Sequence, residues 1–329
     1  MSTTTVEIEF RTAIRDALAE ELERDSRVIF FGEDVAKAGG VFAVTKGLYE
    51  RFPDRVFDTP ISELAITGAA FGAAVCGKRP VIEIMFGDFL GLSLDSLVNQ
   101  AAKYWYFTQG QTSAPLVVRS AVGAGGRFGA IHSQMPISWF FGVPGLKIVC
   151  PATPADAKGL LKAAIRDDNP VLFFEHKKLY SLKGPVHDEV IPLGQAAIVR
   201  PGRDLTMVTA MKGVHDCLAA AERLAERGIE AEIVDLRTLK PLDRVTILAS
   251  LRKTNRLMVV EEGPRTGGWA GEVMAIFVEE GLDDLDDAWR LCTPDHPIPY
   301  SPALEDAFLP GADAIVRSVL DRPSFAHTA

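Results

Sequence analysis

The feature that most constrains the fold is a regular alternation between short apolar runs and longer stretches with helical spacing. Runs such as 27–32 (RVIFFG) are continuously apolar and end in glycine, as buried parallel strands do. The runs expected to be strands in the first half are 27–32, 55–58, 80–85, 115–119, 147–150 and 171–174. Apolar residues at helical spacing predict helices over 7–24, 63–76, 93–108 and 154–166. This alternation predicts a mostly parallel sheet with helices on both faces.

A second, smaller unit of the same kind is expected after residue 202. Residues 186–202 carry Pro and Gly with few periodic apolar positions, so they are expected to be a linker. The alternation then restarts, with strands expected at 205–209, 231–235 and 257–260 and helices at 214–227 and near 244–253. The sequence therefore predicts an α/β protein with two domains, residues 1–185 and 203–329.

Composition limits the classes of function. The 329 residues are 47% apolar and 24% charged with a net charge of −9, which is typical of a globular protein. Nucleic-acid binding needs a basic face, so a nucleic-acid partner is not expected. No apolar stretch is long enough for a membrane span, and the four cysteines form no CxxC pair, so we expect a cytoplasmic protein with reduced thiols.

One candidate for acid–base chemistry is Glu63, in the run Asp58–Glu63 (DTPISE). It is expected to begin a helix just after a strand, among apolar neighbours. Burial raises the pKa of a carboxyl group, whereas a helix N-terminus lowers it. Glu63 is therefore either an acid able to share a proton near neutral pH or a residue that only stabilises its helix.

A second candidate is His132, which follows the glycine-rich loop 123–129 (GAGGRFG). Phe128 stands where a dinucleotide-binding GxGxxG motif needs its last glycine, so that motif is absent. We expect a mobile wall that admits a substrate. The alternative is a surface histidine without a role.

Seven blocks in order carry a family resemblance: 32–35, 58–63, 85–89, 99–103, 132–134, 151–161 and 235–243. With them the chain resembles the beta subunit of the thiamine-diphosphate-dependent decarboxylating component of 2-oxoacid and acetoin dehydrogenases, in the transketolase-like superfamily. The resemblance implies a pyrimidine-binding domain followed by a transketolase C-terminal-like domain.

The resemblance also implies roles for particular residues. Glu63 would hydrogen-bond the cofactor's aminopyrimidine ring and favour its imino form, with Leu64 contacting the cofactor beside it. Met85 and Phe89 would wall the pyrimidine. His132 would act as an acid–base or orienting group when the acyl unit passes to lipoamide.

Metal binding is expected to be divided between subunits. Thiamine enzymes hold the diphosphate through Mg²⁺ with a GDG motif followed by an NN pair, and this sequence contains neither. The resemblance places the Mg²⁺ ligands on an alpha subunit. It also implies a K⁺ site formed by backbone carbonyls, for which a polar turn is the alternative; the expected carbonyls belong to Ala114, Leu116, Ala164, Asp167 and Asn169.

The implied function is oxidative decarboxylation of a 2-oxoacid and reductive acylation of a lipoyl group. The implied partners are an alpha subunit, in an alpha2beta2 heterotetramer, and a lipoyl-bearing acyltransferase core whose docking the tail 321–329 is expected to influence. Alternatives are an acetoin dehydrogenase beta subunit, half of a split transketolase and a non-catalytic scaffold. A scaffold would be expected to lose Glu63 or His132, and a transketolase to show His- and Arg-rich sugar-phosphate clusters.

Overall fold

The computed structural model of the chain describes residues 6–325. The chain forms two compact units, one from residues up to Val122 together with Trp139–Leu193, the other from Gly123–Ser138 together with residues from Gly194 onward. The loop that contains His132 therefore belongs to the second compact unit. The end of the tail 321–329, residues 326–329, lies outside the described residues.

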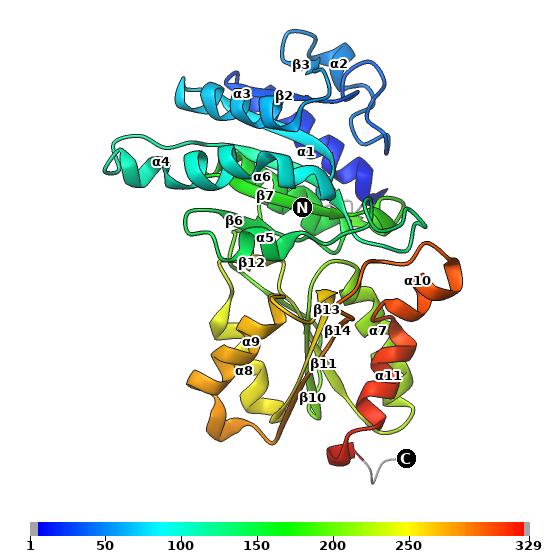
Figure 1. Ribbon diagram of the computed structural model, residues 1–329. Coiled ribbons are helices and arrows are strands. Elements are labelled where there is room, and N and C mark those ends of the chain that lie inside the picture. The colour runs from blue at the N-terminus through cyan, green and yellow to red at the C-terminus, as the bar shows by residue number, and fades with distance from the viewer. Residues whose placement is uncertain (1–5, 326–329) are drawn as a thin grey trace. The chain divides into compact units, whose positions relative to one another are not determined.

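The first unit is built on parallel strands in the order β3-β2-β4-β5-β7-β6 (Figure 1). Their bounds are β2 Val28–Gly32, β3 Val56–Asp58, β4 Arg79–Phe86, β5 Val117–Val122, β6 Lys147–Val149 and β7 Val171–His176. In the register of this sheet Gly32 lies opposite both Asp58 and Glu83. The expected parallel sheet is confirmed.

Helices connect these strands. They are α1 Phe10–Arg24, α2 Leu48–Arg51, α3 Glu63–Val75, α4 Ala102–Phe107 and α6 Pro154–Arg166, with the 3-10 turn Lys177–Leu179 after β7. The α6 helix begins where expected because Thr153 caps it: the Thr153 Oγ1 accepts the Asp156 N–H at 3.1 Å, and Pro154 occupies the first turn. The α1 and α6 helices pack against each other, and α3 packs on β4.

Two segments of the first unit differ from the expected helices. Residues Val6–Glu9 form β1, which pairs antiparallel with β8 (Lys183–Val186), so α1 starts at residue 10. The stretch expected as one helix over 93–108 is a 3-10 helix (Gly87–Ser93), a π-helix (Asp95–Ala101) and then α4. The Asp95 carboxylate accepts hydrogen bonds from the side chains of Asn99 and Gln100, both at 2.8 Å.

A buried group of charges lies in the middle of this sheet. Arg119 on β5 donates to Glu83 on β4 at 2.7 Å and to both carboxylate oxygens of Glu175 on β7 at 2.7 and 2.8 Å. The hydroxyl of Tyr180 also donates to Glu175, at 2.9 Å. Burial raises the pKa of Glu175, and the Arg119 guanidinium opposes that shift. We refer to Arg119, Glu83 and Glu175 as the buried ion triad.

The second unit contains a sheet in the order β14-β13-β10-β11-β9, in which β9 is antiparallel to β11 and the other pairs are parallel. The bounds are β9 Ala197–Arg200, β10 Leu205–Thr209, β11 Ala231–Asp235, β13 Arg256–Pro264 and β14 Asp287–Thr293. The β9 strand lies within residues 186–202, so part of the segment expected to be a linker is an edge strand of this sheet.

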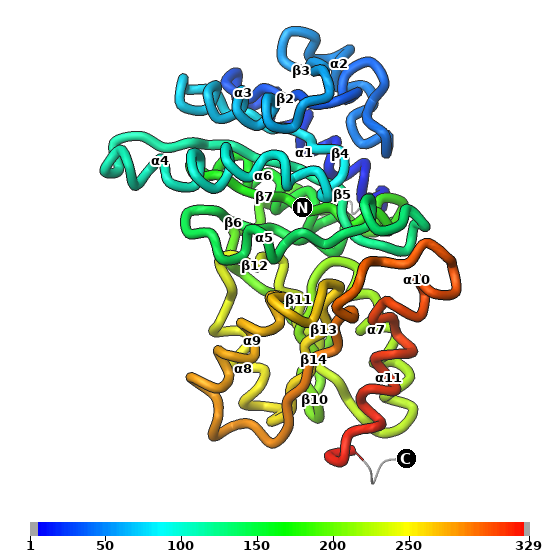
Figure 2. The backbone as a smooth tube through the Cα atoms, in the orientation of Figure 1, coloured from blue at the N-terminus to red at the C-terminus, as the bar shows by residue number. Residues whose placement is uncertain are grey.

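Helices cover both faces of the second sheet (Figures 1 and 2). The α7 and α11 helices pack together on one face, and α8 and α9 lie on the other. The remaining bounds are α5 Ile137–Phe141, α7 Lys212–Ala225, α8 Arg244–Thr254, α9 Ala270–Glu280, α10 Pro302–Phe308, α11 Ala312–Leu320, the short strand β12 Thr238–Lys240 and the 3-10 turns Leu282–Asp284 and Pro323–Phe325.

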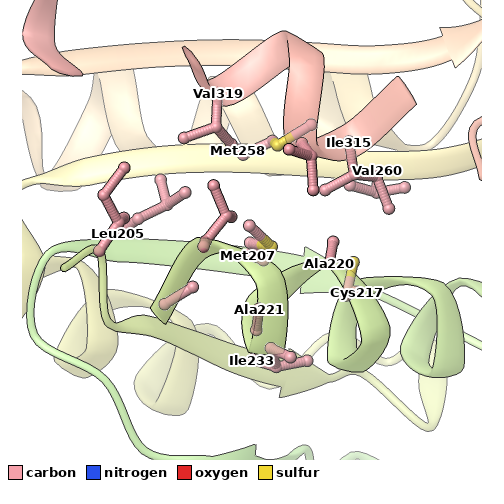
Figure 3. Packing of buried hydrophobic residues seen from close by; sticks show 14 of the residues in the cluster. Leu205, Met207, Cys217, Ala220, Ala221, Ile233, Met258, Val260, Ile315 and Val319 are labelled. Atoms are coloured by element: carbon pink, nitrogen blue, oxygen red, sulfur yellow. The ribbon is translucent and has the colours of Figure 1, made fainter. Parts of the chain in front are cut away.

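The core of the second unit lies between α7, α11 and the sheet (Figure 3). Leu205 and Met207 of β10 pack with Ala221 of α7 and with Ile315 and Val319 of α11, all of them fully buried. Within residues 6–325, no helix combines the length and apolar character required to cross a bilayer.

Candidate active site

Of the predicted residues of the first unit, Glu63, Met85 and Phe89 lie at the carboxyl ends of its parallel strands, whereas the residues predicted to hold K⁺ lie before the amino ends of β5 and β7. The carboxyl edge is where ligands bind in open α/β sheets. The neighbouring strands approach closely there because residue 32 is glycine: a Cβ at Gly32 would lie 2.6 Å from the Glu83 carbonyl oxygen. The Thr59 N–H donates to the Gly32 carbonyl at 2.9 Å, which brings the chain after β3 beside the end of β2.

Glu63 is the first residue of α3 and only 7% exposed. Its carbonyl accepts a hydrogen bond from the Thr67 hydroxyl at 2.6 Å and another from the Ser93 hydroxyl at 3.3 Å. The Ser62 side chain does not cap the helix. Ser93 of the neighbouring 3-10 helix thus helps to hold the first turn of α3. This turn carries a buried carboxyl group at the edge of the sheet.

A second acidic residue, Glu33, lies close enough to Glu63 for their charges to interact. Burial raises the pKa of Glu33, and the negative charges of Glu63 and Asp34 raise it further. Our sequence reasoning used Glu33 only as part of a family block and did not assign it to the site. Carboxyl groups with a raised pKa in a buried site are candidates for acid–base chemistry, so Glu33 belongs with Glu63 in the candidate site.

Apolar side chains lie near this acidic pair. Met85 is the last residue but one of β4 and is half-buried, and the ring of Phe89 packs edge-on against Phe86 with the ring centroids 6.2 Å apart. Leu64 is 54% exposed and Ile61 81% exposed. Partly exposed apolar groups beside a buried acid can bind a flat heteroaromatic ring with a polar edge.

His132 belongs to the second unit and is half-buried. Its backbone N–H donates to the Gly129 carbonyl at 3.5 Å, and the Gly123 N–H donates to the Gln134 carbonyl at 3.3 Å. The glycine-rich loop therefore closes on itself around the histidine.

Two carboxylates from the second unit hold this loop, and the sequence reasoning missed both. The Ala124 N–H donates to Glu262 at 2.6 Å, and the Gly125 N–H donates to Glu305 at 2.9 Å. Arg127 donates to Glu305 through its backbone N–H at 3.3 Å and its guanidinium at 2.5 Å. No local pattern identifies these partners, which are about 140 and 180 residues away in the sequence.

Three of the five carbonyls expected to hold K⁺ already accept hydrogen bonds within the chain. The Leu116 carbonyl accepts the Val171 N–H at 2.8 Å, and the Ala164 carbonyl accepts the Asp167 N–H at 3.2 Å. The Asp167 carbonyl accepts the Arg79 guanidinium at 2.7 Å. Each carbonyl oxygen keeps a second lone pair, so the loop retains acceptors for a cation although Arg79 supplies one positive charge already.

Among the described residues, His, Cys, Asp and Glu form no group of three or more that is arranged to hold a metal ion. The predicted Ala114 and Asn169 lie in the same part of the first unit as Leu116 and Asp167, and the Asn169 N–H donates to the Asp167 carboxylate at 2.9 Å.

Comparisons with known proteins match two family domains in succession along the chain. Residues 6–183 match the family described as the transketolase pyrimidine-binding domain, and residues 194–315 match the transketolase C-terminal domain. Over 98% of its length the chain also resembles the whole of a solved split-gene transketolase in an inactive beta4 tetramer, with a TM-score of 0.81 and 23% identity. That likeness shows the fold.

Relatives with closer sequences agree on the family. The beta subunit of the acetoin:2,6-dichlorophenolindophenol oxidoreductase of Cupriavidus necator is 47% identical, covering 94% of this chain and 95% of its own. The 2-oxoisovalerate dehydrogenase subunit beta of Bacillus subtilis is 46% identical (95% and 98% covered). The mitochondrial pyruvate dehydrogenase E1 component subunit beta-1 of Arabidopsis thaliana is 44% identical (95% and 88%). The resemblance read from the sequence blocks is thereby confirmed, and the chain belongs to the family of beta subunits of 2-oxoacid and acetoin dehydrogenases.

Proposed function

We propose that this chain, together with an alpha subunit, catalyses the thiamine-diphosphate-dependent oxidative decarboxylation of a 2-oxoacid and the reductive acylation of a lipoyl group. The observation that supports this most directly is the buried Glu63 at the carboxyl edge of the first sheet, close enough to Glu33 for its charge to raise the pKa of that residue. When bound, thiamine diphosphate would supply the carbon nucleophile and electron sink for the decarboxylation.

Glu63 would hold a proton at the ring nitrogen of the cofactor's pyrimidine. A carboxyl group at this position acts through a hydrogen bond, so its burial matters more than its charge. Leu64, Met85 and Phe89 would contact the flat ring and exclude water from the hydrogen bond. The Mg²⁺ that binds the diphosphate would be held by the alpha subunit.

His132 would serve the second half of the reaction. Opening the lipoyl disulfide produces a thiolate that must gain a proton, and imidazole titrates in the right pH range for that task. His132→Ala should therefore lower lipoyl acylation far more than decarboxylation followed with an artificial electron acceptor. Equal losses in both assays would assign His132 to substrate orientation instead.

The proposal of an alpha subunit, in an alpha2beta2 assembly, is supported by exposed apolar side chains on elements that pack on one another. Ile61, Leu64, Leu92 and Tyr106 are exposed on or beside α3, the 3-10 segment and α4. Large apolar surfaces of this kind mark protein interfaces. A lipoyl-bearing acyltransferase core would be the second partner. Because the four cysteines form no disulfide within the described residues, we propose a cytoplasmic location.

Acetoin is the second candidate substrate, because the acetoin-type relative is 47% identical and the 2-oxoisovalerate-type relative 46%. Co-expression with an alpha subunit from each relative, followed by dye reduction with pyruvate, 2-oxoisovalerate and acetoin, tests both candidates. A stable complex that shows no thiamine-dependent turnover with any of the three would refute the proposed function.

We also propose that carbonyls of Ala114, Leu116, Ala164, Asp167 and Asn169 hold K⁺ in a structural role. The test is the melting temperature of the assembled enzyme in potassium chloride and in choline chloride at equal ionic strength. A higher value in potassium is expected. Equal melting temperatures in the two salts would contradict the K⁺ site. The Arg79 guanidinium would then be the cation that stabilises this loop.

A further inference from the structure

Glu305 is a fully buried carboxylate that the mechanism above does not use. It lies on α10, and its carboxylate oxygens accept hydrogen bonds from the glycine-rich loop. Oε1 accepts the Gly125 N–H at 2.9 Å, and Oε2 accepts the Arg127 N–H at 3.3 Å and the Arg127 guanidinium at 2.5 Å. Hydrogen bonds to an ionised acceptor are about twice as strong as neutral ones, so Glu305 stabilises the conformation of the loop.

The loop requires this stabilisation because part of its backbone has an unfavourable conformation. Arg127 has φ of +64°, a left-handed conformation that a residue with a Cβ adopts only when its surroundings impose it. The Arg127 guanidinium also contacts Asp306 at 2.8 and 3.0 Å, but that carboxylate is largely exposed. The buried partner, Glu305, is therefore the one that fixes the conformation of Arg127.

The same segment also supports the far end of the loop. Tyr300, five residues before Glu305, packs against Gly129, where an added Cβ would lie 3.3 Å from the Tyr300 ring. The Gly129 carbonyl in turn accepts the His132 N–H. Residues 300–305 therefore contact the loop at Gly125 and at Gly129, and the Gly129 carbonyl binds the backbone of His132.

We propose that Glu305 is a positioning residue: through Arg127 and the amides of the glycine-rich loop it holds the conformation that presents His132. This inference rests on the role of His132 in the proposed function. Glu305 itself touches neither substrate nor cofactor in this assignment.

The main variants are Glu305→Gln, which keeps the size of the side chain but removes its charge, and Arg127→Met, which removes the other half of the contact. Asp313→Asn is the matched control, because Asp313 is an exposed carboxylate paired with Arg223 in the same unit. Arg127→Lys tests whether a restored charge rescues the loop. Replacing Glu305 or replacing Arg127 breaks the same contact. The effect of the double variant should therefore be little larger than that of Glu305→Gln alone.

Three readouts apply to the full chain and to its complex with an alpha subunit. Amide hydrogen exchange across 123–134 should accelerate about ten- to a hundredfold in Glu305→Gln and Arg127→Met, the worth of a lost charge-assisted hydrogen bond. The ring resonances of His132 should shift. Lipoyl acylation should fall by a similar factor and by far more than dye-coupled decarboxylation, with partial recovery in Arg127→Lys.

A merely structural role would lower both activities by one common factor, and that result would overturn the proposal. Unchanged exchange and unchanged His132 resonances in both variants would also overturn it. If the wild-type complex shows no thiamine-dependent turnover, the proposed function fails, and exchange and the His132 resonances still decide whether Glu305 positions the loop.

Discussion

Replacing Arg119 with methionine should destabilise the first unit strongly. The side chain is 1% exposed and makes three charge-assisted hydrogen bonds to Glu83 and Glu175. Counted separately, such bonds each contribute about 1.5–3 kcal/mol to the free energy of unfolding, so their sum is an upper limit for the loss. Removing one partner of a buried ion pair costs about 3–5 kcal/mol because the remaining charge is left without compensation. We expect a loss of about 4 kcal/mol at pH 8.

The loss should depend on pH. Burial already raises the pKa of Glu175 and Arg119 opposes that shift, so removing Arg119 raises the folded-state pKa further. A carboxyl group with a raised folded-state pKa favours folding below its unfolded pKa and loses that contribution as pH rises through the folded value. The deficit of Arg119→Met should therefore be smaller at pH 5 than at pH 8.

Urea unfolding followed by tryptophan fluorescence measures this effect in the correct unit. Trp269 and Trp289 lie in the second unit, so replacing both with phenylalanine leaves only the tryptophans of the first unit as reporters. The matched control is Arg51→Met, because the side chains of Arg51 and its partner Glu23 are 50% and 65% exposed. That control should lose less than about 1 kcal/mol.

The reasoning is refuted if Arg119→Met loses no more than the control, or loses equal amounts at pH 5 and pH 8. A third variant separates charge from packing. Replacing the whole buried ion triad with Met and Leu should recover most of the loss, because no charge is then left uncompensated.

Three further predictions concern the site and its neighbourhood. Glu63→Gln should leave assembly intact and lower turnover by about 10²–10⁴-fold, the usual worth of a positioned proton transfer, and near-normal turnover would leave Glu63 a helix-stabilising role only. Isothermal titration of the isolated chain should detect no micromolar binding of magnesium–thiamine diphosphate; such binding would contradict the shared site. Burial raises the pKa of Glu261 from 4.5 to about 7, against hydrogen bonds from the Ala270 and Trp269 amides. Its contribution to the unfolding free energy should thus fall by about 3 kcal/mol between pH 4.5 and 7, and an unchanged pH slope in Glu261→Gln would exclude it as the cause.

Elements with local signals could be predicted from the sequence. The α6 helix has a capping threonine, a proline in its first turn and a periodic apolar face, and both of its ends were predicted correctly. The helix expected over 93–108 was wrong in its first part, because Asp95 binds side chains four and five positions ahead and the backbone there is a π-helix. Apolar periodicity does not distinguish that geometry from an α-helix.

Edges and long-range partners were not predictable in this way. The β9 strand is short, with two exposed and two half-buried residues, so it differs from a buried strand. Glu33 was recognisable only as part of a family block, and its effect depends on its distance from Glu63. Glu262 and Glu305 bind backbone amides of a loop far away in the sequence, and no residue pattern encodes which carboxylate will reach an amide.

The membership of residues 123–138 in the second unit has a consequence for recombining this chain with its relatives. The chain leaves the first unit at residue 122 and returns to it at residue 139, so a single crossover near residue 193 does not exchange complete units. Such a chimera would separate Arg127 of this chain from Glu305. Exchanging residues 123–138 together with everything after residue 193 would keep this loop with Glu262 and Glu305.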